Sequence, residues 1–138
     1  MQIETAATSV LTQTEILGKI NFFDEEPEWC LPPNFWDRSS ALKGYTVFPL
    51  GSRISFPQRQ CHISALIVVA EGAAVGEKLE YCTGYAQYKE HWTRHSWVIH
   101  RKDMILLEVT PNTFDQYFGV ILTDIELKQF KEIIDYKE

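Results

Sequence analysis

Residues 61–72 read Cys-His-Ile-Ser-Ala-Leu-Ile-Val-Val-Ala-Glu-Gly and form a mostly apolar segment. Its β-branched content would also suit a buried strand. Its length, its alanines and the closing Gly72 favour a helix that begins at Cys61 and is capped by Gly72.

Four short segments follow, each rich in aromatic or β-branched residues and separated from the next by a polar turn. This pattern is typical of successive antiparallel strands. The segments are residues 78–90, 92–100, 104–110 and 117–122. After them, Thr123 and Glu126 fit a capping box, which predicts a terminal amphipathic helix over about 124–137.

The N-terminal third of the chain is less regular. Residues 5–20 have broadly helical spacing of apolar side chains, and residues 44–50 suit a short strand that ends at Pro49. Residues 24–40 carry three prolines and two tryptophans, which predicts an ordered loop. We expect the tryptophans of this loop, Trp29 and Trp36, to pack on the core. The alternative is that they form one wall of a cleft.

The composition excludes several classes of protein. The chain has 138 residues, 45% of them hydrophobic, which predicts a single domain over 1–138 that folds without metal or disulfide support. A net charge of −6 without a cluster of Lys and Arg argues against a nucleic-acid partner. The longest apolar stretch, 63–70, is far below the roughly 20 residues of a membrane span, and no export signal is visible, so we expect a cytoplasmic protein without a membrane partner.

The three cysteines include no CxxC pair, so they indicate neither a disulfide framework nor a zinc finger. Cys30 and Cys82 are interpreted as structural. Cys61 at the start of a helix would lie where free backbone N–H groups and the helix dipole lower the pKa of a thiol. Gln58 and Gln60 precede it and are candidate oxyanion donors beside the Cys61 amide.

The next hairpin carries His95, the candidate general base for such a thiol. If Arg101-Lys102 forms a two-residue turn, His95 lies directly opposite Glu108, at imidazole–carboxylate contact distance. With a three-residue turn, Val109 faces His95 and the carboxylate points to the other face. Residue types and order are therefore compatible with a thiol activated by an imidazole that a carboxylate orients.

The sequence contains, in this order, Cys61, Tyr81-Cys-Thr-Gly-Tyr85, His95-Ser-Trp97 and Leu107-Glu-Val-Thr-Pro111. These four features together resemble the transglutaminase-like and broader papain-like cysteine hydrolases. The intervals of 34 residues from Cys61 to His95 and 13 from His95 to Glu108 are also similar to those of compact members. The chain further looks like small bacterial and phage proteins that read C-x-x-N-A, E-G-Y, H-A-W, D-P-T and Y-F-G. Tyr117-Phe-Gly119 is the last feature of that second pattern, and the resemblance covers roughly residues 58–122.

The resemblance implies an α+β fold in which an antiparallel sheet of about four to five strands packs against the Cys61 helix. It implies acyl transfer at a peptide, amide or glutamine-type carbonyl, with Cys61 as nucleophile, His95 as general base and acid, and no cofactor. Glu108 stands where the family usually has Asp, and Ser64 where the small proteins often have Asn. A protein or peptide is the expected substrate or partner.

Other interpretations stay open at this point. Each of these residues taken alone is more often structural than catalytic. In the alternative interpretation, the chain is a catalytically degenerate member of the same fold, and its aromatic loop around Trp29 and Trp36 binds a protein partner. Tyr85 and Trp97 join Trp29 and Trp36 as cleft candidates, although a lone tryptophan more often fills the core. Zinc binding by His91 and His95 would need a helix, and their segment reads as a strand, so no metal is expected.

Overall fold

The computed structural model describes residues 13–16, 18–19, 31–51, 60–111 and 113–137, the last five by their backbone alone. Residues 13–16 and 18 are helical, which agrees with the part of the predicted N-terminal helix that they cover. Trp29, Cys30 and Gln58 lie outside the described residues. No helix in these ranges is long and apolar enough to cross a bilayer.

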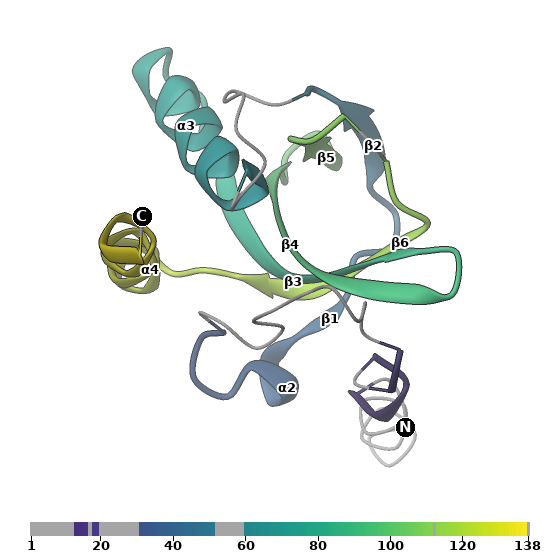
Figure 1. Cartoon of the computed structure of the whole chain (residues 1–138). Coiled ribbons are helices and arrows are strands. Elements are labelled where there is room, and N and C mark those ends of the chain that lie inside the picture. The colour runs from purple at the N-terminus through teal and green to yellow at the C-terminus, as the bar shows by residue number, and fades with distance from the viewer. Residues whose placement is uncertain (1–12, 17, 20–30, 52–59, 112, 138) are drawn as a thin grey trace.

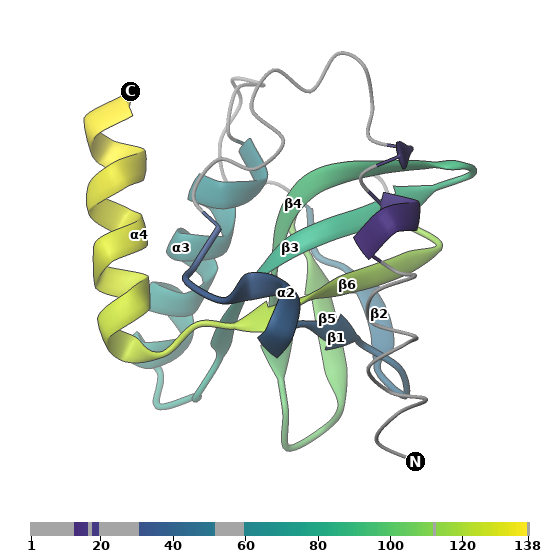
Figure 2. The same ribbon diagram turned by 90° about the horizontal axis from the view of Figure 1, so that it is seen from below.

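The described chain is an α+β structure with one six-stranded sheet. The strands lie in the order β1-β6-β3-β4-β5-β2. Figures 1 and 2 show α3 and α4 on one side of this sheet. The elements are α2 (Phe35–Arg38), β1 (Ser40–Ala41), β2 (Thr46–Pro49), α3 (Gln60–Ala74), β3 (Glu80–Tyr88), β4 (His91–His100), β5 (Ile105–Glu108), β6 (Gln116–Ile121) and α4 (Asp124–Lys137).

The four strands predicted after the Cys61 helix are present as β3 to β6, and β4 pairs antiparallel with both β3 and β5. The sheet as a whole differs from the predicted antiparallel sheet of four to five strands. β2 pairs parallel with β5, so the sheet is mixed. The sequence did not reveal this pairing, because β2 and β5 are joined through α3, β3 and β4 rather than by a turn that fixes their direction.

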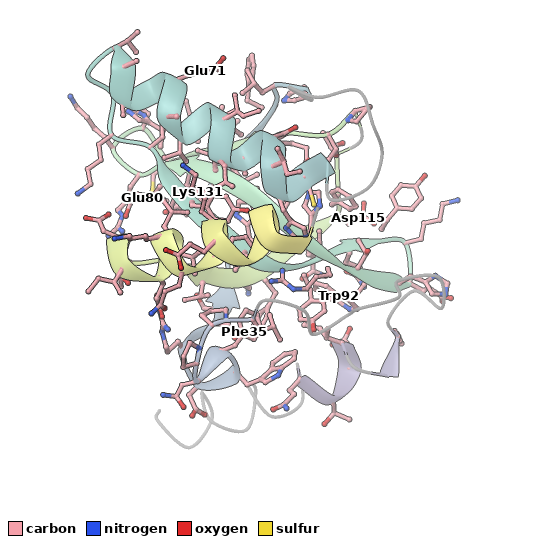
Figure 3. The ribbon with its side chains drawn as sticks, turned by 60° about the vertical axis from the view of Figure 1, so that its left-hand side comes forward. Phe35, Glu71, Glu80, Trp92, Asp115 and Lys131 are labelled. Carbon is pink, nitrogen blue, oxygen red and sulfur yellow. The ribbon has the colours of Figure 1, made fainter. Side chains whose placement is uncertain are left out.

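The segment predicted as a loop contains a single helical turn, α2. Asn34 before it has a left-handed backbone, and the amide of Ser39 closes the turn on the carbonyl of Phe35 at 2.8 Å. Arg38 Nη2 donates to Glu126 Oε1 at 2.8 Å and so attaches this turn to the start of α4. Figure 3 shows the labelled Phe35 between α2 and the sheet.

Helix α3 begins at Gln60, as the sequence indicated within one residue, but it does not end at Gly72. Its C-terminal cap is Gly76, whose φ of +80° is left-handed. The amide of Gly76 bonds the carbonyl of Ala73, and the amide of Glu77 bonds that of Gly72 at 2.8 Å. These two bonds form a Schellman motif, which explains why the helix ends at the second glycine rather than the first.

The predicted capping box at the start of α4 is confirmed. The amide of Glu126 donates to Thr123 Oγ1 at 3.2 Å, and the amide of Thr123 donates to Glu126 Oε1 at 3.1 Å. Two otherwise unsatisfied amides are thereby paired.

The two faces of the sheet carry separate cores because side chains alternate along each strand. In Figure 1 the sheet is curved, with the helices outside the curve. The outer cluster joins the helices to the sheet and includes Phe35, Ala65, Val68, Tyr81, Tyr85, Val98, Phe118 and Phe130. The inner cluster is formed by Cys82, Ala86, Trp97, Ile99, Leu106 and Tyr117.

Gly119 makes room for Trp97, the largest buried ring of the inner cluster. Gly84 and Gly119 pair across β3 and β6, and Gly84 also pairs with His95 on β4. A Cβ atom on Gly119 would lie 2.8 Å from Cη2 of Trp97 and 2.4 Å from the carbonyl oxygen of Thr83. The missing side chain therefore allows the indole to lie over the sheet beside His95.

Replacing Gly119 by alanine is expected to destabilise the protein by about 1–3 kcal/mol, because the methyl group displaces Trp97 and the backbone of β3. Denaturant unfolding of Gly119→Ala and wild type measures the difference. The control is Gly18→Ala, where a Cβ meets nothing within 4 Å. Equal stability of Gly119→Ala and wild type would contradict this packing.

Candidate active site

His95 and Glu108 form a buried pair on the inner face of the sheet. Nε2 of His95 lies 3.0 Å from each carboxylate oxygen of Glu108. His95 is 3% exposed and Glu108 is fully buried. The contact expected from the sequence is therefore present.

The strand register that brings them together differs from both registers considered in the sequence. The turn spans Arg101–Met104, and Val98 pairs with Leu107, whereas a two-residue turn would pair Leu107 with Ser96. Because this shift is two residues, every side chain keeps its face of the sheet. Glu108 thus reaches His95 along a diagonal, which favours its longer side chain over that of Asp.

The carboxylate of Glu108 accepts three further hydrogen bonds. Tyr117 Oη donates to Oε1 at 2.6 Å, and Thr110 donates to Oε2 through its amide at 2.9 Å and its hydroxyl at 2.7 Å. Burial raises the pKa of Glu108, but His95, Tyr117 and Thr110 lower it more, so the net direction is downward. Glu108 is thus held as a carboxylate.

Cys61 lies in the first turn of α3 and is partly exposed. In the described sheet, the ladder between β5 and β4 ends at Val98, so β5 does not pair with β4 at His95. Figure 1 shows the N-terminal end of α3 beside β4. Burial raises the pKa of Cys61, but electrostatic interaction and hydrogen bonding with the imidazoles of His62 and His95 bring it well below its ordinary value.

His95 has the complementary shift. Burial lowers its pKa, but Cys61 and Glu108 raise it more, to about 10. Since Nε2 is occupied by the carboxylate, Nδ1 is the ring nitrogen left for the hydrogen bond with Cys61. The arrangement favours a thiolate–imidazolium pair backed by a carboxylate.

The imidazole of His95 is enclosed by aromatic rings. Trp97 stacks on it with ring centroids 6.0 Å apart, and Phe114 approaches to 4.5 Å. Tyr117 adds a third ring at 6.3 Å. These rings exclude water from the pair and hold the orientation of the imidazole.

Of the aromatic cleft candidates that the structure describes, Trp97 lies beside this pair, and Trp36 and Tyr85 do not. Trp36 stacks on Tyr85 at 5.7 Å in the outer cluster, and Tyr85 lies on the face of β3 opposite to the inner cluster. Trp97 is fully buried beside His95. Trp36, Tyr85 and Trp97 are therefore packing residues, which was the favoured interpretation for the tryptophans, and Trp29 lies outside the described residues.

The candidate oxyanion donors, the second cysteine and the histidines of β4 complete the set of predicted residues. Gln60 is the first residue of α3 and is described by its backbone alone, and Gln58 lies outside the described residues. Cys82 is buried in the sheet, and burial raises its pKa, which fits its structural interpretation. His91 and His95 lie on a strand, as the sequence indicated, and the described residues hold no group of three metal-ligating side chains.

His62 is a buried residue near the candidate site to which the sequence analysis gave no role. It is 5% exposed, and its Nδ1 lies 2.6 Å from Ser96 Oγ. Adjacency to Cys61 was the only signal in the sequence, and it could not show that the imidazole is buried against Ser96.

Comparison with protein-family models found no match to this chain. No curated protein and no solved structure matched it either. The likeness to transglutaminase-like and papain-like proteins therefore stays an expectation from the sequence.

Replacing Glu108 by glutamine is expected to cost about 1–3 kcal/mol at neutral pH, because the amide offers one acceptor oxygen in place of a carboxylate that accepts several bonds. Since the folded-state pKa of Glu108 is lowered, its contribution is full above the unfolded-state value of 4.5 and is lost as pH falls through the folded-state value. The stability gap between wild type and Glu108→Gln should therefore shrink in acid.

Denaturant unfolding from pH 7 down to pH 3 measures this gap. The matched control is Glu77→Gln, whose side chain is 60% exposed and contacts His100, and it should remain within about 0.5 kcal/mol of wild type. A gap for Glu108→Gln that does not change with pH would show that the charge of Glu108 does not stabilise the fold.

Proposed function

We propose that this protein is a cysteine-dependent hydrolase or acyltransferase that acts at a peptide, amide or glutamine-type carbonyl. Cys61 is the nucleophile, His95 the general base and acid, and Glu108 the residue that orients His95. One observation carries the proposal: Nε2 of His95 contacts the buried carboxylate of Glu108, while the interaction of the His95 ring with the Cys61 thiol raises the pKa of the imidazole and lowers that of the thiol.

The first half-reaction forms a bond between the Cys61 sulfur and the carbonyl carbon, while the carbonyl π electrons move to oxygen. When the tetrahedral intermediate collapses, the bond from carbon to the leaving nitrogen breaks. That nitrogen takes the proton from His95, which leaves a thioester and a neutral imidazole. Glu108 stabilises the imidazolium while it exists and fixes the ring orientation.

The second half-reaction uses water for hydrolysis or an amine for transfer. His95 takes a proton from the attacking group as the new bond to the carbonyl carbon forms. The carbon–sulfur bond then breaks and the thiolate is restored. The products are a carboxylic acid in the first case and a new amide in the second.

Two features support attack from the solvent side at Cys61. Cys61 is partly exposed, whereas His95 and Glu108 are buried beneath aromatic rings. At the start of α3, the amides of the first turn have no partner within the helix, and the amide of Cys61 is one of them. Such an amide suits a developing oxyanion, and Gln58 and Gln60 remain predicted as further donors.

The papain-like core belongs to the same proposal. Its support is the chain order, in which a helix headed by the cysteine precedes a strand with the histidine and then a strand with the acid. Among the strands that follow the helix, the pairs β3–β4, β4–β5 and β3–β6 are all antiparallel.

We expect p-nitrophenyl acetate, a reactive ester that many thiol enzymes accept, to acetylate wild-type protein once at Cys61. Intact-mass and peptide mass spectrometry locate the acetyl group, and stopped-flow absorbance measures the rate of p-nitrophenolate release. His95→Ala should slow acetylation by about 10²-fold or more, because it removes the base and the ion pair.

Cys61→Ala should abolish the rapid release of p-nitrophenolate, and Cys82→Ala should leave its rate unchanged, because Cys82 is buried in the sheet. Acetylation spread over surface lysines would refute the assignment of the nucleophile. An acetylation rate of Cys61 that is the same in wild type and His95→Ala would refute it as well.

A further inference from the structure

We propose that Tyr117 and Thr110 are positioning residues of the proposed reaction: each hydroxyl holds one carboxylate oxygen of Glu108, and the carboxylate fixed in this way keeps the proton that it shares with His95 on Nε2. This role rests on the proposed function and deepens it, because it names the residues that allow Glu108 to orient the imidazole.

The side chain of Glu108 does not fix its own carboxylate. The last torsion of a glutamate side chain has a broad energy minimum, so the carboxylate can rotate unless other groups hold it. Glu108 also reaches His95 along a diagonal, because the β4–β5 ladder ends at the pair Val98–Leu107. The orientation of the carboxylate must therefore come from the residues around it.

One hydroxyl group holds each oxygen of the carboxylate. Tyr117 Oη donates to Oε1 at 2.6 Å, and Thr110 Oγ1 donates to Oε2 at 2.7 Å. Nε2 of His95 lies 3.0 Å from both oxygens, so neither oxygen is favoured. Rotation of the carboxylate would break both hydroxyl bonds. These two bonds therefore set the direction in which Glu108 meets the imidazole.

The chemistry of the partners fixes the direction of each hydrogen bond. The amide of Thr110 can only donate, and it gives Oε2 a further hydrogen bond at 2.9 Å. A carboxylate has about four acceptor sites, which two hydroxyls, one amide and the imidazole N–H fill. A proton on Glu108 would displace one of these donors. The carboxyl group therefore stays ionised, and the proton shared with His95 lies on Nε2.

The bond from Tyr117 lies in the interior of the protein. Tyr117 is 4% exposed and Glu108 is fully buried, so water competes little for this bond. Tyr117 belongs to β6, and β3 and β4 lie between β6 and β5 in the sheet. The ring of Tyr117 packs edge-on against Trp97, with centroids 5.1 Å apart. Packing thus holds the hydroxyl at the carboxylate across two intervening strands.

The charged groups around Glu108 give this role a measurable sign. Among the described residues, His95 faces the carboxylate from β4 and Tyr117 from β6, and Cys61 on α3 interacts with His95 in turn. Loss of one hydroxyl donor weakens the stabilisation of the negative charge, so the pKa of Glu108 should rise. The carboxylate also becomes free to rotate, so the imidazole of His95 is held less firmly.

The first measurement follows the carboxyl ¹³C NMR signal of Glu108 from pH 8 to pH 2 in wild type, Tyr117→Phe and Thr110→Val. Glu108→Gln identifies the signal. Each of the two test variants removes a hydroxyl with little change of shape, so the midpoint of the titration should rise by about one pH unit. A side chain that only filled space would leave the midpoint unchanged.

The second measurement is the rate of p-nitrophenolate release at pH 7. Tyr117→Phe should lower this rate about tenfold, because a loosely held imidazole is less often in the reactive orientation. Thr110→Val should lower it as well. Two controls should stay within about twofold of wild type: Thr110→Ser, which keeps a hydroxyl, and Tyr45→Phe, since Tyr45 packs against the same inner cluster and is not among the described donors to Glu108.

The two measurements separate this role from the proposed function. A carboxyl midpoint that is the same in wild type and in both test variants would overturn the role of Tyr117 and Thr110. If Tyr117→Phe does not fold, Thr110→Val carries the test, with Thr110→Ser as its matched control.

His95→Ala completes the series. If it slows p-nitrophenolate release while Tyr117→Phe and Thr110→Val release it at the wild-type rate, the positioning role is refuted and the proposed function stands. If His95→Ala releases it at the wild-type rate, the proposed function fails, and the carboxyl titration still decides whether the two hydroxyls hold Glu108.

Discussion

The buried carboxylate of Glu108 is the constraint on which the site depends. A fully buried charge costs several kcal/mol unless its oxygens are paired, and Glu108 is paired by His95, Tyr117 and Thr110. These partners come from β4, β6 and the residues after β5, so one charge connects the strands of the inner face. The same contacts fix the imidazole of His95, so the stability of the sheet and the geometry of the proposed site depend on the same hydrogen bonds.

The sheet topology explains how a helix on the outer face supplies the partner of a histidine on the inner face. β5 leaves β4 after the pair Val98–Leu107 and continues beside β2, where the amides of Leu50 and Gly51 bond the carbonyl of Glu108. Beside His95, Cys61 contributes to the site from the first turn of α3. The end of the β4–β5 ladder, the start of α3 and Gly119 against Trp97 are three local features of one site.

The sequence predicted what depends on local pattern: the Cys61 helix, the four strands after it, the capping box at Thr123 and the shared face of His95 and Glu108. It did not predict what depends on distant pairing. The parallel contact of β2 with β5 and the four-residue turn at Arg101 have no local signature. The position of His62 depends on a ring rotamer fixed by Ser96, 34 residues away, and the end of α3 depended on which of two glycines adopts the left-handed backbone.

The central claim is that Cys61 and His95 form a thiolate–imidazolium pair, and the most direct test is a titration of the His95 ring nitrogens by ¹⁵N NMR in wild type and Cys61→Ala. We expect His95 to stay protonated in wild type until the pH rises to about 10, and to lose its proton at lower pH when Cys61 is removed. A wild-type imidazole that titrates near the ordinary histidine value of about 6.5, or one that is unaffected by Cys61→Ala, would contradict the pair.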